Sequence, residues 1–254
     1  MILIFPSIEI KEGQSVQFVQ GESGCERIYS VDPIQLAVLW RGENAKVLYV
    51  IDLDGVVSGT LKNRHLIELM VKTVDIPIQV SGGLHDYHTI ASLFEADVYR
   101  VVLGSAAFHT PELVQKIIRD FGARKIAVAI EARAGKLRTD GGTVEHDQSP
   151  IRFAKQMKDM GVCRFIYSEY SEDGQKKILN LHSLQEFAVQ TNVRVTTQGG
   201  VNSYQDLISL QALERFGVDS VIIGKALYEN NFPCQRLWRI NENDLQDLSP
   251  TRRW

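Results

Sequence analysis

The sequence has little cysteine, and none of it is arranged as a Cys-x-x-Cys pair. The three cysteines, Cys25, Cys163 and Cys234, are far apart and odd in number. This argues against a disulfide framework and against a cysteine-based structural zinc site, and it is typical of proteins from a reducing compartment. We therefore expect a cytoplasmic protein.

Long hydrophobic runs and a strong charge of one sign are also missing. No apolar stretch approaches the roughly 20 residues of a membrane span, and the short apolar start of the chain lacks the basic leader of a signal peptide. A formal net charge of −3 gives no broad positive field for nucleic acid or for an anionic membrane. We expect neither as a partner.

Histidines in metal-ligand spacing are nearly absent as well. Only His85 and His88 lie close enough in sequence to form such a pair, and they fall in an expected loop and helix start, where a solvated surface is the simpler interpretation. The sequence also shows no Ser-His-Asp order and no Cys-His pairing. We therefore predict no metal.

The chain does contain a regular alternation of short apolar runs with longer amphipathic stretches. The apolar runs are rich in Val and Ile and mostly lack polar alternation, as do the strands of a parallel sheet that helices cover. They lie near 2–8, 47–51, 76–80, 98–103, 126–130, 164–167, 193–196 and 220–223. Helices are expected over 33–40, 61–74, 87–95, 111–121, 151–160, 181–190, 204–216 and 227–232.

Eight strand–helix units in 254 residues predict one (β/α)8 barrel, or TIM barrel. The alternative is an open, doubly wound sheet. No linker rich in Pro or Ser and no charge block divides the chain, so we expect a single domain over 1–254. Its half-barrels would span about 1–122 and 123–235, followed by a C-terminal tail to 254.

An internal repeat supports two similar half-barrels. The first half contains, in order, Ile8-Glu9, Asp52-Leu53-Asp54-Gly55, Gly82-Gly83 and Gly104-Ser105. The second half contains Ile130-Glu131, the segment 169–174, Gly199-Gly200 and Gly224-Lys225 in the same order. The offset is about half the chain, which is too long for a solenoid repeat. It predicts a barrel with a two-fold half-barrel repeat.

The repeated glycines follow the expected strands three, four, seven and eight, at the barrel end where TIM-barrel active sites lie. Glycine lets backbone N–H groups approach an anion closely, and a following helix start adds a partial positive charge. A single Gly-Gly after a strand is more simply a tight turn. Two glycine turns in succession, occurring twice, predict two phosphate cradles, formed by Gly82, Gly83, Gly104 and Ser105 and by Gly199, Gly200, Gly224 and Lys225.

Two carboxylates occupy equivalent places in the halves, Glu9 at the end of strand one and Glu131 at the end of strand five. Opposed carboxylates suit a reaction that protonates one atom and deprotonates another. The alternative is that each is a polar strand-end residue in a structural hydrogen bond. Ser168 and Glu169, at the end of strand six, are candidates for substrate contact, and Asp52 is either a supporting anchor or a turn residue.

Together these residues resemble the HisA/HisF family of histidine biosynthesis, and more closely its isomerase branch. The resemblance covers nearly the whole chain and includes 6–13, Gln20-Gly21, Asp32-Pro33, 51–55, Asp173-Gly174, 221–229 and the glycine pairs. It implies a half-repeat TIM barrel, a small-molecule ribotide with a phosphate at each end, and an Amadori rearrangement of an aminoaldose to an aminoketose without metal or cofactor. It implies Glu9 as general base, Glu131 as general acid and Ser168 as the supporting hydroxyl.

The sequence departs from the family at the reacting end. The family carries aspartate at both acid positions, threonine at Ser168, arginine near Gln17 and often Gly-Trp at Gly141-Gly142. A catalytic group misplaced by about 1 Å loses on the order of 100-fold in rate. The alternatives to the isomerase are therefore a catalytically altered or inactive paralogue that binds a phosphorylated metabolite, and a HisF-like cyclase subunit. A cyclase normally has lysine near Gln17 and aspartate at strand five. We expect a monomer, with a homodimer as the alternative.

Overall fold

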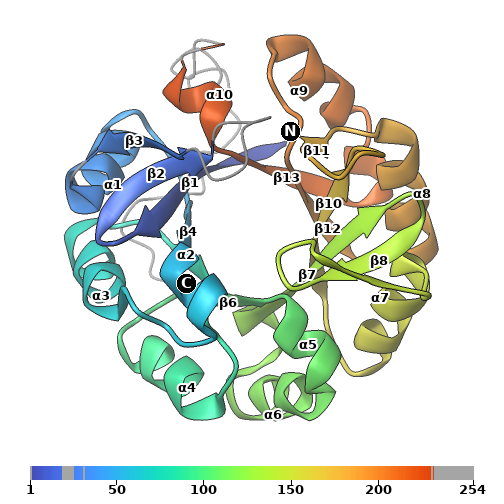
Figure 1. Ribbon diagram of the computed structural model, residues 1–254, viewed down its shortest axis with the longest axis horizontal. Coiled ribbons are helices and arrows are strands. Elements are labelled where there is room, and N and C mark those ends of the chain that lie inside the picture. Colours follow the sequence, from blue (N-terminus) through green and yellow to red (C-terminus); the bar gives the residue numbers. More distant parts are fainter. Residues whose placement is uncertain (1, 19–25, 31, 230, 232–254) are drawn as a thin grey trace.

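The computed structural model describes residues 2–18, 26–30, 32–229 and 231. Eight of the strands described close into a parallel barrel with helices around its outside (Figure 1). The barrel strands are β1 (Leu3–Lys11), β4 (Leu48–Asp52), β5 (Ile78–Ser81), β6 (Arg100–Leu103), β7 (Ile126–Arg133), β10 (Arg164–Tyr170), β12 (Arg194–Gln198) and β13 (Val218–Ile223). Pairing of β10 with β7 and of β1 with β13 closes the ring. The predicted TIM barrel is confirmed, and the open sheet is excluded.

The helices connect successive barrel strands. They are α1 (Pro33–Gly42), α2 (Leu53–Ser58), α3 (Arg64–Thr73), α4 (Tyr87–Glu95), α5 (Ser105–His109), α6 (Pro111–Phe121), α7 (Pro150–Asp159), α8 (Leu181–Thr191), α9 (Tyr204–Gln211) and α10 (Lys225–Tyr228). Helix α1 begins as predicted, because the Asp32 carboxylate accepts the amides of Ile34 and Gln35 and Pro33 opens the helix. None of the helices described is long and apolar enough to cross a membrane.

Three expected helices differ most from the helices observed. The helix expected over 61–74 starts at Arg64, because the amides of Lys62 and Asn63 turn aside to bind the Asp52 carboxylate. The helix expected over 204–216 breaks after α9, where the Leu213 amide bonds the Leu210 carbonyl and the chain tightens into 3-10 geometry. The last helix ends at Tyr228, and residue 232 lies outside the described part.

Five strands lie beyond the eight that the apolar runs predict. They form hairpin extensions above the barrel: β2 (Gln14–Phe18), β3 (Glu26–Ser30), β8 (Lys136–Thr139), β9 (Val144–His146) and β11 (Lys177–Ile178). Strand β2 folds back on β1, β8 on β7, and β11 on β10, all antiparallel. The extensions therefore gather over the carboxyl-terminal end of the barrel, in both halves.

The strand register shows how the two halves correspond. Starting at Ile8, the paired residues are Val50, Val80, Val101 and Ile126. Ile130 lies four residues after Ile126 on β7. Starting from Ile130, the paired residues on the following strands are Tyr167, Thr197, Val221 and finally Ile4, which lies four residues before Ile8 on β1. Each half therefore contributes an equal stagger, and the two give the shear of eight of a TIM barrel. Ile8 and Ile130 stand at equal height on opposite sides, and so do Glu9 and Glu131 after them.

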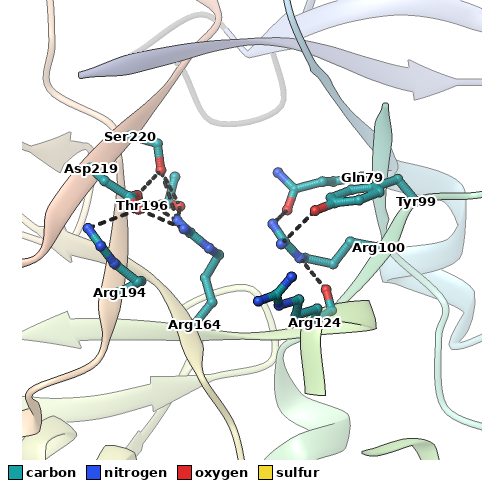
Figure 2. A network of polar contacts seen from close by, with 9 residues as sticks. All are labelled: Gln79, Tyr99, Arg100, Arg124, Arg164, Arg194, Thr196, Asp219 and Ser220. Atoms are coloured by element: carbon teal, nitrogen blue, oxygen red, sulfur yellow. Dashed lines mark hydrogen bonds and ion pairs between the residues drawn. The ribbon is translucent and has the colours of Figure 1, made fainter. Parts of the chain in front are cut away.

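A polar network fills the amino-terminal end of the barrel (Figure 2). Its members include Gln79, Arg100, Arg164, Thr196, Asp219 and Ser220. The Arg164 guanidinium donates two hydrogen bonds of 2.7 Å to the two oxygens of Asp219. Beside it, buried Arg100 donates to the Gln79 side chain at 2.8 Å. In TIM barrels this end serves stability rather than chemistry.

Replacing Asp219 with asparagine should lower the free energy of unfolding at pH 7 by about 3 kcal/mol, because a largely buried Arg164 loses its counterion. Burial opposes ionisation of Asp219, but the hydrogen bonds and charge of Arg164 outweigh it and leave the pKa of Asp219 below its ordinary value. This stabilisation is present above the unfolded-state pKa of about 4 and is lost as the pH falls through the lower folded-state pKa. Denaturant unfolding should show that the free energy of unfolding falls less between pH 7 and pH 3 in the variant than in the wild type.

Asp75→Asn is the matched control. Asp75 also pairs with an arginine, Arg41, but 57% of its side chain is exposed. An exposed pair of this kind contributes less than about 1 kcal/mol. Equal losses of stability in the two variants would contradict the account of the network.

Candidate active site

Polar side chains line the inner face of the barrel at its carboxyl-terminal end. Phe5 belongs to the apolar cluster inside the barrel, so the alternation along β1 also directs Ser7 and Glu9 inward. Ala127 belongs to the same cluster, and alternation along β7 brings Glu131 to the inner face. Together with the register, this places both predicted acid–base groups at one level of the barrel mouth, on opposite sides.

Each of these carboxylates stands where its barrel strand continues into a hairpin. Glu9 pairs with Val16 on β2, and Glu131 pairs with Arg138 on β8. The partner follows seven residues later in both cases, so the two hairpins have the same register. The two halves therefore share the pairing of these hairpins as well as the sequence motifs. The hairpin pairing was not predicted from the sequence.

Glu131 accepts two hydrogen bonds on one oxygen. Lys177 donates from Nζ to Oε1 at 2.7 Å, and the Tyr170 hydroxyl donates to the same atom at 3.3 Å. The contact with Lys177 is an ion pair in which 26% of the lysine side chain and 19% of the glutamate side chain are exposed. In both hydrogen bonds Glu131 is the acceptor, and Lys177 and Tyr170 are the donors.

Lys177 enters the site from β11, where it pairs with Tyr170 across a short hairpin. Its stem packs against Gly199, where a Cβ would lie 2.4 Å from the Lys177 Cβ. Burial disfavours the ammonium, but the charge and hydrogen bond of Glu131 outweigh it and raise the pKa of Lys177. Lys177 is therefore a cation in the mouth of the barrel.

Tyr49 forms part of the floor of the site. It is buried, and its hydroxyl donates to the Ser81 hydroxyl at 2.9 Å. Burial raises the pKa of Tyr49 to about 12, against the opposing effects of Ser81 and Lys177 and with smaller contributions from the Glu131 and Glu9 carboxylates. The same phenol thus interacts electrostatically with all three charged groups, and it stays neutral at physiological pH.

Ser168 and Glu169 face opposite ways, although they adjoin in sequence. Ser168 is buried and pairs with Glu131 in the register of β10 and β7, on the inner face. Glu169 accepts hydrogen bonds from the Tyr167 hydroxyl and from Asn180, the residue that caps α8. The structure therefore brings Ser168 to the carboxylates and gives Glu169 a supporting position behind them.

Asp52 is fully buried and has the geometry of an anchor. Its carboxylate accepts the Gly55 amide at 3.0 Å, the Asn63 amide at 2.9 Å and the Asn63 side chain at 2.7 Å. Asn63 also donates to Asp54. Asp52 thus holds the loop after β4 beneath Gly82, whose Cβ position would lie 2.2 Å from the Asp52 carbonyl.

The glycine turns of the two halves have nearly the same backbone. Gly82 and Gly199 both have φ +95°, while Gly83 and Gly200 have φ +69° and +75°. Gly104 (φ −95°, ψ −108°) and Gly224 (φ −109°, ψ −94°) match as well. The Gly-Gly turns also pack tightly on the preceding loops, and this requires glycine with or without a ligand. The structure thus pairs the four turns in two matching sets.

Ser105 and Lys225, which follow Gly104 and Gly224, have side-chain partners of their own. The Ser105 hydroxyl accepts the Asp140 amide at 2.7 Å, which ties the loop after β8 to the first cradle. Lys225 Nζ lies 3.8 Å from an oxygen of Glu229, the residue that follows α10, and 35% of the lysine side chain is exposed.

The family departure at Gly142 has a structural counterpart. A Cβ at this position would lie 2.6 Å from the Tyr170 ring, so the tyrosine occupies the space into which a side chain at residue 142 would extend. The side chain of Gln17, another position at which the sequence departs from the family, lies outside what the structure describes. Over the described ranges, no three His, Cys, Asp or Glu side chains gather as a metal site would require.

Sequence reasoning missed Lys177, Tyr170 and Tyr49. A usable signal for the first two was the Asp173-Gly174 pair, which forms a turn with Gly174 at φ +74°. An Asp-Gly turn between two short runs is typical of a hairpin, and a hairpin centred there sets Lys177 opposite Tyr170. Tyr49 lay within an apolar run that gave no sign of its hydroxyl.

Comparison with known proteins agrees with this geometry. The family model described as "Histidine biosynthesis protein" matches residues 3–233. Similar proteins from Prosthecochloris aestuarii (42% identical; 93% of this chain and 91% of that protein), Chloroherpeton thalassium (42%; 96% and 93%) and Salinibacter ruber (40%; 98% and 96%) share one name. Each is a 1-(5-phosphoribosyl)-5-((5-phosphoribosylamino)methylideneamino)imidazole-4-carboxamide isomerase. The resemblance seen in the motifs is confirmed, and the chain belongs to the histidine biosynthesis protein family.

Proposed function

We propose that this protein is an aldose–ketose isomerase of histidine biosynthesis that acts on the ribotide after which its relatives are named. One observation carries the proposal. Two sets of glycine turns with matching backbone flank Glu9 and Glu131, which stand at equal height on the inner face of the barrel. This arrangement suits a substrate that is held at both ends and changed in the middle.

The chemistry of the substrate fits the two cradles. The name shared by the relatives contains two 5-phosphoribosyl groups, one of them attached through an amine. One phosphate would bind at Gly82, Gly83, Gly104 and Ser105, and the other at Gly199, Gly200, Gly224 and Lys225. Backbone N–H groups in such turns form anion-binding concavities. The ribosylamine would then lie between them, over Glu9 and Glu131.

The reaction proceeds in two stages that acid–base groups alone can perform. An acid on the Glu131 side protonates the ring oxygen of the ribosylamine, and the ring opens to a Schiff base. The Glu9 carboxylate then removes the proton from the neighbouring carbon, and the enolamine collapses to the aminoketose. Ser168, beside Glu131, offers a hydroxyl to the intermediate. A positioned acid or base typically contributes about 10²- to 10⁴-fold in rate.

Because one chain supplies Glu9, Glu131 and Ser168, we propose that the protein works as a monomer. The test is to incubate the purified protein with the ribotide in a buffer that contains a chelator and no ammonia. We expect an aminoketose product of unchanged mass.

Two other results would overturn the proposed reaction. Tight binding of the ribotide without turnover would leave a metabolite-binding paralogue. Turnover that requires ammonia or a glutaminase would identify a cyclase subunit.

A further inference from the structure

The hydrogen bonds around Glu131 raise a question about the source of the first proton. Both contacts reach the same oxygen, and in both the glutamate is the acceptor, from Lys177 at 2.7 Å and from Tyr170 at 3.3 Å. In the contact between Lys177 and Glu131 the donated proton is on the lysine nitrogen. The nearest group that carries a proton and a positive charge is the ammonium of Lys177.

We propose that Lys177 is the proton donor for ring opening, and that Glu131 is a positioning residue that holds its ammonium over the barrel mouth. This inference rests on the proposed isomerase function. It assigns a role to a residue outside the predicted catalytic set.

Three features fix Lys177 where a donor is needed. Strand β11 is held to β10 by antiparallel pairing, so the backbone of Lys177 is set by the sheet. The absence of a side chain at Gly199 makes room for the lysine stem. Glu131 then directs Nζ toward the inner face, where the charges of Lys177, Glu131 and Glu9 all influence Tyr49. The amine thus lies between the second cradle and the two carboxylates.

The step balances with the groups already present. The Lys177 ammonium gives a proton to the ring oxygen as the bond between that oxygen and C1 breaks, while the lone pair of the substrate nitrogen forms the C1=N bond. Glu9 takes the proton from C2, and the electrons return to nitrogen through a C1=C2 bond. When the ketose forms, the C2 hydroxyl returns a proton to the Lys177 amine and Glu9 delivers its proton to C1. Both residues end as they began.

The ammonium keeps its proton until charge develops on the ring oxygen. The negative charge of Glu131 raises the pKa of Lys177, so the group is protonated throughout the physiological range. The ring oxygen becomes strongly basic only as its bond to C1 breaks, so the proton moves when charge has developed. Before that, the ammonium stabilises the same charge electrostatically.

The test compares Lys177→Met with Glu131→Gln in the ribotide assay. Removing the donor should lower kcat by about 10²- to 10⁴-fold. Glu131→Gln should lose only about tenfold, because the amide oxygen still accepts from the ammonium through a weaker, uncharged acceptor. If Glu131 itself were the acid, the order would be reversed. Lys176→Met is the matched control, since Lys176 is the exposed neighbour in sequence, and its kcat should equal that of the wild type.

Lys177→Arg guards against a purely structural effect. Arginine keeps the positive charge and the pairing with Glu131 but is a far weaker acid. We expect wild-type thermal stability and a kcat nearly as low as that of Lys177→Met. Full activity of Lys177→Arg, or of Lys177→Met, in a protein whose wild type turns over would overturn the role of Lys177 and leave the isomerase intact. No turnover by the wild type would overturn both.

Discussion

Glu9→Gln should lower kcat for the ribotide by about 10²- to 10⁴-fold while leaving its binding intact. Glu9 is the inward-facing carboxylate of β1 and, in the account given above, the only group that removes the C2 proton. Glutamine fills the same volume but cannot accept that proton. Because the phosphates are held elsewhere, the dissociation constant should change little, and calorimetry on the variant measures it without turnover.

Glu95→Gln provides the control for a change from acid to amide. Glu95 is an exposed residue at the end of α4, outside the barrel. Its variant should match the wild type in both kcat and binding. A Glu9→Gln protein that turned over at the wild-type rate would show that the base lies elsewhere.

Of the glycine-to-alanine substitutions in the proposed site, Gly200→Ala should lower kcat/KM the most. The new Cβ would lie 2.0 Å from the Leu179 amide nitrogen and 2.4 Å from the Ile178 carbonyl carbon, both of them backbone atoms. Strand β11 must therefore move, and with it Lys177 and the wall of the second cradle. A shift of about 1 Å in such a site costs on the order of 100-fold in kcat/KM. Steady-state kinetics of the ribotide reaction measures it.

Gly135→Ala separates this clash from backbone strain. Gly135 has φ +76°, against +75° for Gly200, but its Cβ would have no atom within 4 Å. It should therefore lose about 1–2 kcal/mol of stability through the left-handed backbone alone and keep its kcat/KM. If the two alanine variants had equal kcat/KM, the Gly199-Gly200 turn would have no part in holding the substrate.

The barrel could be predicted because its strands are buried on both faces. Runs such as 47–51 and 98–103 consist mostly of apolar residues, and the structure buries every residue of β4 and β6. The hairpins could not be predicted in this way. Strand β8 reads Lys-Leu-Arg-Thr, and only alternate residues of it are buried. The position of β8 depends on its pairing with β7, and a strand held in this way does not need the continuous apolar run by which the barrel strands were recognised.

The sequence predicts the outline of the proposed site for a related reason. A motif repeated at half-chain spacing can be recognised in the sequence without knowledge of side-chain contacts. The motif includes Glu9 and Glu131 and the glycine turns. Lys177 has no counterpart in that repeat, since its position depends on a hairpin and on the space above Gly199. The role of glutamate at residue 131 also could not be predicted from the sequence, because it depends on the contact between Glu131 and Lys177.

The most direct test of the whole account is a crystal structure of the Glu9→Gln protein with the intact ribotide. The account predicts one phosphate at Gly82, Gly83, Gly104 and Ser105 and the other at Gly199, Gly200, Gly224 and Lys225. It also predicts the C2 hydrogen of the ribosylamine facing residue 9 and the ring oxygen within hydrogen-bond distance of Lys177 Nζ. A phosphate bound away from either set of glycines, or a ribosylamine turned away from residue 9, would contradict it.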